Sequence, residues 1–148
     1  MKIFNGKKEA EKILSDLKKK IKKEKKRPKL AIIVIGENPA SNLYVKLKKE
    51  AAEKINIEVV ENKFQKKLKE KEIIQKIKDF NRDKSVNGII VQLPLPAGFK
   101  TEKIIQAISP KKDVDGFHKL NRKLLKNPKP YFFPVLPLAI LTALKNAG

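Results

Sequence analysis

The chain has 148 residues, of which 36 are Lys or Arg and 16 are Asp or Glu, so its formal net charge is +20. Apolar residues make up 41% of it, which is enough to build the core of one domain. No apolar run approaches the roughly 18 residues of a membrane-spanning helix, and the amino terminus carries no secretory signal pattern, so we expect no membrane partner. The absence of Cys excludes disulfide scaffolds and thiolate metal sites.

The positive charge points first to a polyanionic partner, because a strongly basic surface is typical of nucleic-acid binders. Only Arg27, Arg82 and Arg122 are Arg, however, and the other basic residues are all Lys. Arg provides the planar fork that suits phosphate and guanine recognition. We therefore interpret the charge mainly as Lys enrichment of exposed surfaces, and a basic nucleic-acid-binding module is kept as an alternative function.

Helices and short apolar runs alternate along the first part of the chain. Apolar residues at helical spacing predict a helix over 7–25. The β-branched run 29–36 predicts a strand that is buried on both faces. Asn38 and Pro39 are favoured at the start of a helix, so we expect one over 39–54. This third element carries one apolar side, made of Leu43, Leu47 and Ala51 and continued by Ile55.

The same alternation continues to the end of the chain. The further predicted elements are a strand over 56–61, a helix over 69–80, a strand over 88–93, a helix over 101–108, a loop over 110–133 with a short helix near 119–126, and a helix over 134–147. This order predicts an α/β domain of three layers, in which a small, mostly parallel sheet is flanked by helices. Ligands bind at the carboxyl ends of such strands, which points to segments 36–41, 91–96 and 112–118. No Gly-rich phosphate loop of the GxGxxG or GxxxxGK[ST] form occurs, so we expect no nucleotide site in this chain.

Tyr44 and Lys48 are the first candidates for chemistry. They are four residues apart on the helix predicted over 39–54, so they lie on one face of it, one turn apart. Spacing alone favours a solvated Lys and a partly buried Tyr. The functional alternative is a desolvated Lys that acts as an acid or base, with the Tyr hydroxyl orienting it.

The other predicted ligand segments add polar candidates. Gln92 interrupts an apolar strand, so its amide either reaches the end of the sheet or contacts a ligand. Asp113 and Asp115 precede Gly116, a pattern that is also typical of an ordinary turn. These carboxylates are too few for a metal site, and we expect none. His118 is the one His of the chain, and we expect it at the surface.

Three segments taken together resemble one enzyme family. They are 36–55 (GENPASNLYVKLKKEAAEKI), 88–96 (GIIVQLPLP) and 112–118 (KDVDGFH). In this order they closely resemble methylenetetrahydrofolate dehydrogenase/cyclohydrolase, and the VQLPLP and KDVDGF strings are highly specific when they occur together. The resemblance covers the N-terminal, folate-binding catalytic domain of that family.

The resemblance implies a reaction and a set of site residues. The family oxidises 5,10-methylenetetrahydrofolate to the 5,10-methenyl cation by hydride transfer to NADP or NAD, and then hydrolyses the cation to 10-formyltetrahydrofolate. Carried over to this sequence, Lys48 assists proton movement during water attack and ring opening, and Gln92 holds it in place. Asp115 accepts two hydrogen bonds from the pterin edge, and Tyr44 lies against the ring system. The substrate contacts so implied are Tyr44, Val91, Gln92, Leu93, Pro94 and Asp115.

The sequence departs from the family pattern in three places. The family has a second, dinucleotide-binding domain, so we expect residues 1–133 to form the folate-binding catalytic domain and 134–148 a linking helix toward an NAD(P)-binding domain. The site for NADP or NAD is expected in that other domain, with none bound by this chain alone. The usual Pro-Cys-Thr-Pro segment reads PVLP at 134–137, and the usual Asn-x-Gly-Arg-Leu segment reads NRKLL at 121–125. These changes alter one edge of the site, so a truncated, inactive folate-binding domain is the other alternative.

The resemblance also implies partners. We expect tetrahydrofolate derivatives as ligands, including forms with polyglutamate tails that a Lys-rich rim would attract. We expect a homodimer for the complete enzyme, a cytoplasmic location and no nucleic-acid partner.

Overall fold

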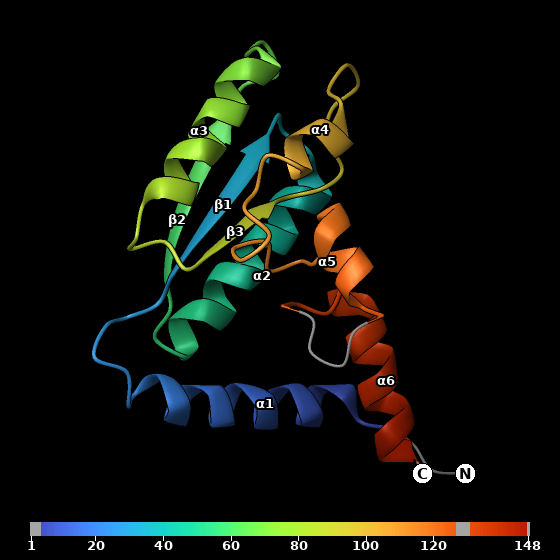
Figure 1. The fold of residues 1–148 in the computed structure, drawn as a ribbon. Coiled ribbons are helices and arrows are strands. Elements are labelled where there is room, and N and C mark those ends of the chain that lie inside the picture. Colours follow the sequence, from blue (N-terminus) through green and yellow to red (C-terminus); the bar gives the residue numbers. More distant parts are fainter. Residues whose placement is uncertain (1–3, 127–130, 148) are drawn as a thin grey trace.

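The computed structural model describes residues 4–126 and 131–147 (Figure 1). Its elements alternate as the sequence predicts. In chain order they are α1 (Gly6–Ile21), β1 (Lys29–Ile35), α2 (Pro39–Lys54), β2 (Glu58–Phe64), α3 (Glu70–Arg82), β3 (Gly88–Val91), α4 (Thr101–Ile105), α5 (Lys119–Leu124) and α6 (Val135–Ala147).

The three strands form one sheet in the order β2-β1-β3. Both pairings are parallel, and Ala31 of the central strand lies opposite Val60 of β2 and Ile89 of β3. The predicted α/β class is confirmed, and all strand pairs of the described sheet are parallel. β1 is buried from Ala31 to Ile35, which explains why the strand is a continuous apolar run rather than an alternating one.

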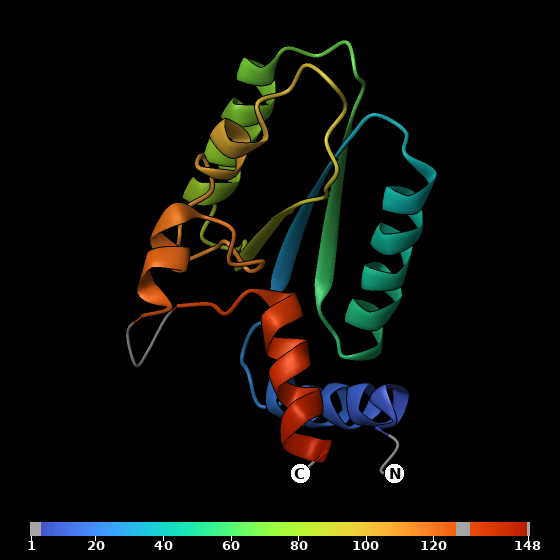
Figure 2. The ribbon, with the colours of Figure 1, turned by 90° about the vertical axis from the view of Figure 1, so that its right-hand side faces the viewer.

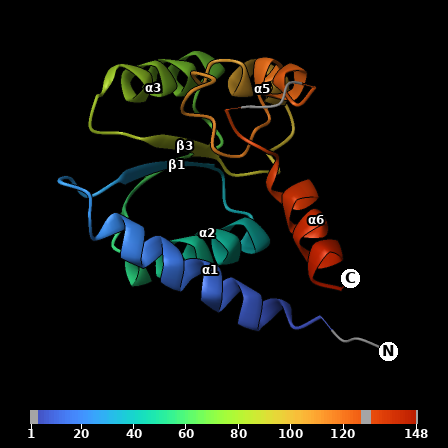
Figure 3. The ribbon, with the colours of Figure 1, turned by 60° about the horizontal axis from the view of Figure 1, so that its bottom comes forward.

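Helices cover both faces of the sheet. Figure 3 shows α3 and α5 on one side of the strands and α2 and α1 on the other, and Figure 2 shows the same layers from the side. Successive residues of β1 point to opposite faces, so they supply two cores. Ile33 packs toward Ile73 and Ile77 of α3, whereas Ile32 packs with Val45 of α2. Burying one such side chain stabilises the fold by roughly 1.5–3 kcal/mol.

The helix α2 begins and ends where the sequence predicts. The Asn38 side-chain oxygen accepts a hydrogen bond from the Ser41 backbone N–H at 2.9 Å, which caps the helix. The apolar side that the spacing picks out is not the buried one, because Leu43 and Leu47 are 57% and 49% exposed. The buried residues of α2 are Ser41, Val45 and Ala52.

Other predicted boundaries were wrong by a few residues. β2 begins at Glu58 rather than at 56, because Asn56 adopts a positive φ of 64° in the turn that ends α2. β3 ends at Val91, so Gln92 follows the strand instead of lying inside it, although its N–H still donates to the Ile33 carbonyl at 2.9 Å.

Two helices are shorter than predicted. α1 ends at Ile21, the last apolar residue of its stripe, since the Lys-rich segment after it has no apolar side chain to bury. α4 is a single short helix of five residues, Thr101–Ile105, and turns continue the chain to Ile108.

The helix α6 leaves the body of the domain, and its C-terminal end lies near the start of α1 (Figures 1 and 3). Its side chains are apolar but open to solvent, with Leu136 72% and Leu144 63% exposed. Across the described ranges 4–126 and 131–147, no helix is both long and apolar enough to cross a membrane.

Candidate functional site

Lys48 and Gln92 meet at the carboxyl edge of the sheet. The Lys48 Nζ donates a hydrogen bond to the Gln92 Oε1 at 3.0 Å, and Lys48 is half-buried. The Gln92 amide also donates to the Leu93 carbonyl at 2.8 Å, which fixes the direction in which its oxygen points. Gln92 is only 9% exposed, so both of its hydrogen-bonding groups have the partners that burial demands.

α2 is tied to the segment after β3 at a second point. The Ser41 hydroxyl donates a hydrogen bond to the Leu93 carbonyl at 3.4 Å. Ser41 lies about two helical turns before Lys48 on α2. Leu93 is half-buried and Pro94 is exposed, so both are open to a ligand. The side chain of Val91 packs in the core on the α3 side of the sheet and is 4% exposed, so this predicted substrate contact has no free side chain to offer.

Asp115 brings a carboxylate into the same neighbourhood. It is half-buried on the segment between α4 and α5, which runs parallel to β3 with Asp113 opposite Ile89. Burial raises the pKa of the Asp115 carboxyl, the nearby Lys48 ammonium partly offsets this rise, and the carboxylate of Asp113 adds to it. Lys48, Gln92 and Asp115 thus come from three segments of the chain, with Lys48 hydrogen-bonded to Gln92 and its charge acting on the Asp115 carboxyl.

Tyr44 lies one turn before Lys48 on α2 and is 59% exposed. Its ring is therefore available to an incoming ligand, in keeping with the position that the resemblance implies. In this structure it belongs to the rim of the site, whereas Lys48 and Gln92 belong to its wall.

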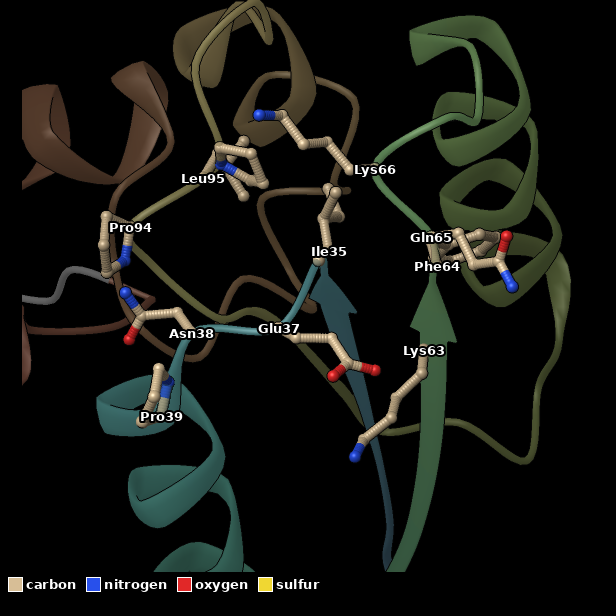
Figure 4. Close-up of a pocket in the computed structure, with 12 residues that line it drawn as sticks. Ile35, Glu37, Asn38, Pro39, Lys63, Phe64, Gln65, Lys66, Pro94 and Leu95 are labelled. Atoms are coloured by element: carbon tan, nitrogen blue, oxygen red, sulfur yellow. The ribbon is translucent and has the colours of Figure 1, made fainter.

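A hollow of about 790 Å³ opens at the carboxyl ends of the strands. Pro94 and Leu95 line it from one side, and Phe64 and Gln65 line it from the end of β2 (Figure 4). The residues that line it do not include Lys48, Gln92 or Asp115. The candidate site is therefore built on the Lys48–Gln92 hydrogen bond and not on this hollow.

The structure also shows a polar cluster that sequence reasoning missed. Asp113 is 1% exposed, and its Oδ2 accepts hydrogen bonds from the His118 N–H and the Asn121 side chain, each at 2.8 Å. The expected surface position of His118 was wrong, because this residue is 9% exposed and its Nδ1 caps α5 by accepting from the Leu120 N–H at 3.1 Å. The one signal in the sequence was the first Asp of the KDVDGF string.

The Lys48–Gln92 pair and the Asp115 carboxylate have the chemical groups needed to bind a polar ligand and to transfer a proton to or from it. A Lys held by an amide oxygen can give or take a proton at a defined point. A half-buried carboxylate can accept a pair of hydrogen bonds from adjacent N–H groups of a ligand. Both groups lie toward the edge of the sheet where α/β domains bind ligands, which makes them a candidate site for a ligand that undergoes acid–base chemistry.

Comparisons with known proteins identify the family of the chain. Residues 4–115 match the catalytic domain of the tetrahydrofolate dehydrogenase/cyclohydrolase family. The chain is 43% identical over 144 residues to the bifunctional protein FolD of Methanosphaerula palustris, and the match covers 97% of this chain and 51% of that protein.

Solved structures show the same fold. The crystal structure of the bifunctional enzyme FolD, a methylenetetrahydrofolate dehydrogenase/cyclohydrolase from Campylobacter jejuni, superposes with a TM-score of 0.91 at 37% identity, covering 96% of this chain and 52% of that one. The Trypanosoma brucei dehydrogenase-cyclohydrolase, solved with NADP cofactor and inhibitor, shares the fold with a TM-score of 0.93 at 23% identity, covering 99% of this chain and 52% of that one.

The chain belongs to the tetrahydrofolate dehydrogenase/cyclohydrolase family and corresponds to its catalytic domain. It spans about half the length of the curated relatives that it matches.

Proposed function

We propose that this chain provides the folate site of a methylenetetrahydrofolate dehydrogenase/cyclohydrolase. The substrates are 5,10-methylenetetrahydrofolate, which is oxidised to the 5,10-methenyl cation, and that cation, which is hydrolysed to 10-formyltetrahydrofolate. The observation that carries the proposal is the Lys48–Gln92 hydrogen bond of 3.0 Å beside a half-buried Asp115, within a family member.

Each side chain has a role that its surroundings support. Lys48 moves the proton when water attacks the methenyl carbon and the ring opens, and Gln92 keeps its Nζ at one position. Asp115 anchors the pterin by accepting two hydrogen bonds from the 2-amino-pyrimidinone edge. Tyr44, which is mostly exposed on the rim, packs against the bound ring.

The backbone and side chains after β3 form the remaining contacts. The accessible side chains of Leu93 and Pro94 make apolar contact with the ring system. The side chain of Val91 is buried in the core, so Val91 contributes to the site through its backbone. The ligand class is tetrahydrofolate derivatives, including those with polyglutamate tails, and the reaction takes place in the cytoplasm.

The hydride acceptor is NADP or NAD, and it binds outside this chain. The sequence holds no Gly-rich dinucleotide loop, so its residues do not fit that cofactor, and no step here is derived through it. In this proposal the folate-binding domain is 1–133, and the segment 134–148, which contains α6 (Val135–Ala147), links it to an NAD(P)-binding domain. The exposed apolar side chains of α6, such as Leu136 at 72%, support such a docking role, and the complete enzyme forms a homodimer.

Titration of the chain with 5-formyltetrahydrofolate, a stable reduced folate, tests the proposal. We expect saturable binding that Asp115→Ala abolishes. Asp79→Ala is the matched control, since Asp79 is an exposed carboxylate on the outer helix α3, and it should leave binding intact.

The outcome separates the three candidate functions. No saturable folate binding by the folded chain would contradict the proposal and favour an inactive domain. Binding of an RNA oligomer with a steep salt dependence, in the absence of folate binding, would favour the basic polyanion-binding module suggested by the charge of +20.

A further inference from the structure

The KDVDGFH segment at 112–118 carries more than one functional group, and only Asp115 has a role in the proposed function. The three residues before it contact neighbouring elements: Lys112 and Asp113 form hydrogen bonds, and Val114 packs against the core. The segment also runs beside β3, since the Ile89 N–H donates to the Lys112 carbonyl at 2.7 Å and Ile89 forms a parallel bridge with Asp113.

Lys112 fastens the segment to α3. Its Nζ donates hydrogen bonds to the Phe80 carbonyl at 2.8 Å and to the Asp83 carbonyl at 2.7 Å, at the end of that helix. The carbonyls at a helix C-terminus lack partners within the helix and carry partial negative charge, so a Lys ammonium binds well there. Lys112 therefore holds the 112–118 segment against α3. We call this contact, and the contact of Asp113 with α5 described next, the clamps of the segment.

Asp113 fastens the segment to α5. Its buried Oδ2 accepts from the backbone N–H of His118, the N-cap residue of that helix, and from the Nδ2 of Asn121 inside it. Asn121 is fully buried and also donates to the Pro110 carbonyl at 2.9 Å, which closes the loop on itself. A buried carboxylate bonded in this way resists displacement, because moving it would leave its oxygen without hydrogen-bond donors.

Val114, between the two Asp residues, fills the space above Gly88 of β3. A Cβ added at Gly88 would lie 2.6 Å from the Val114 Cγ1, so the glycine is required for this close approach. Residues 112, 113 and 114 are thus fixed to three different elements, and Asp115 is the next residue along the chain.

We propose that Lys112 and Asp113 are positioning residues of the folate site, which by clamping the segment to α3 and α5 hold the Asp115 carboxylate beside Lys48. Neither residue touches the ligand. The proposal rests on the proposed function for the statement that Asp115 binds folate. The position of Asp115 itself is measurable without any ligand.

Binding of 5-formyltetrahydrofolate to Lys112→Met and Asp113→Ala tests the proposal. We expect both variants to bind about 10-fold or more weakly, since small displacements of a positioned group reduce its effect strongly. The conservative variants Lys112→Arg and Asp113→Asn keep a donor or an acceptor in place and should recover much of the affinity.

Two matched controls separate positioning from general loss of stability. Lys111→Met removes the neighbouring Lys, which is exposed, and Ile77→Val removes one methyl group from the core against α3. Both should bind folate within about 2-fold of the unaltered chain, because neither touches the clamps. Equal binding by Asp113→Ala, Lys112→Met and Ile77→Val would overturn the proposal.

A ligand-free measurement keeps this test apart from the proposed function. The backbone and side-chain NMR signals of Asp115 should shift in Asp113→Ala, which removes the accepting carboxylate, and much less in Asp113→Asn, which keeps an acceptor. The amide signals of 113–118 should shift in Lys112→Met and not in Lys111→Met. If the signals of Asp115 and of its segment stay unchanged in Asp113→Ala and Lys112→Met, the positioning role is wrong whether or not the chain binds folate. If they change in a chain without folate affinity, only the proposed function fails.

Discussion

Lys48 and Gln92 are 44 positions apart in sequence, and their side chains are joined by a hydrogen bond of 3.0 Å between the Lys Nζ and the Gln Oε1. The bond connects α2 to the chain just after β3, the two elements that flank the carboxyl edge of the sheet. A half-buried Lys that is held at one point differs from the many exposed Lys residues of this chain. The buried side-chain amide of Gln92 fixes the position of the Lys48 Nζ.

Replacing Lys48 with Met tests its role in proton transfer. The hydrolysis of 5,10-methenyltetrahydrofolate needs no dinucleotide, so it is measured directly by the loss of the absorbance of the methenyl compound. We expect Lys48→Met to slow it by about 100-fold, the range of a lost acid–base group. Lys46→Met, on an exposed face of the same helix, should hydrolyse it at the unaltered rate. Equal rates for the two variants would show that Lys48 has no catalytic role.

The part of the fold that depends on local signals was predictable from the sequence. Asn38 and Pro39 fix the start of α2 because capping and a preset φ act within a few residues, and its predicted span agrees with the structure. The start of β2 depends instead on the positive φ of Asn56, a turn that the apolar pattern does not show. The exposure of Leu43 and Leu47 could not be predicted from the apolar pattern of α2 either, because the pattern does not tell which neighbouring element covers a helix face.

The site was predictable to the extent that its motifs are specific. Spacing alone does not distinguish Lys48 from Lys46 or Lys49, and the distinction comes from the long-range contact with Gln92. The buried positions of Asp113 and His118 were not predictable, because they depend on how α5 folds back onto the segment before it. Long-range polar contacts of this kind leave no periodic trace in a single sequence.

The pH dependence of folate affinity follows from the surroundings of Asp115. Its pKa is raised by burial and by Asp113, and lowered by Lys48. In the proposed function the carboxylate form accepts the hydrogen bonds of the pterin, so we expect full affinity above this pKa and a loss of affinity as the pH falls through it. We therefore expect the loss to begin at a higher pH than for an ordinary Asp, whose pKa is about 3.9.

A variant gives the sign of this effect a second check. Lys48→Met removes the charge that favours the Asp115 carboxylate, so the midpoint of the affinity loss should move to higher pH. Lys46→Met should leave the midpoint where it is. Titration of 5-formyltetrahydrofolate binding between about pH 4 and pH 8 measures both, and affinity that stays constant across this range would contradict the role of Asp115.

Replacing Gly88 with Ala should disturb the site from a distance. The new Cβ would lie 2.6 Å from Val114 Cγ1, and Val114 is β-branched and half-buried, so the backbone beside Asp115 has to move. We expect a loss of about 1–3 kcal/mol in the free energy of unfolding, as for other overpacked positions, together with weaker folate binding. Gly6→Ala, where among the described residues the added Cβ would meet Phe4 at 3.6 Å, should leave folate binding unchanged. A Gly88→Ala chain with unaltered folate affinity would show that the segment adapts without moving Asp115.

The high positive charge gives a prediction about the tail of the substrate. Folates carry one or more glutamates, and a net charge of +20 creates a positive potential that raises the association rate of an anionic ligand. Lys46 and Lys49 are exposed on α2, the helix that carries Lys48, and they form ion pairs with Glu50 at 3.9 Å and with Glu61 at 2.7 Å. We expect a pentaglutamate folate to associate faster than the monoglutamate in low salt. This advantage should shrink as salt shortens the Debye length from about 30 Å at 0.01 M to about 8 Å at 0.15 M.

Stopped-flow measurement of the two association rates at both salt concentrations tests this prediction. The variant is Lys46→Gln/Lys49→Gln, and its charge-matched control is Lys71→Gln/Lys78→Gln on the outer helix α3. Rates that depend on neither tail length nor salt would show that the charge of this surface plays no part in capturing folate.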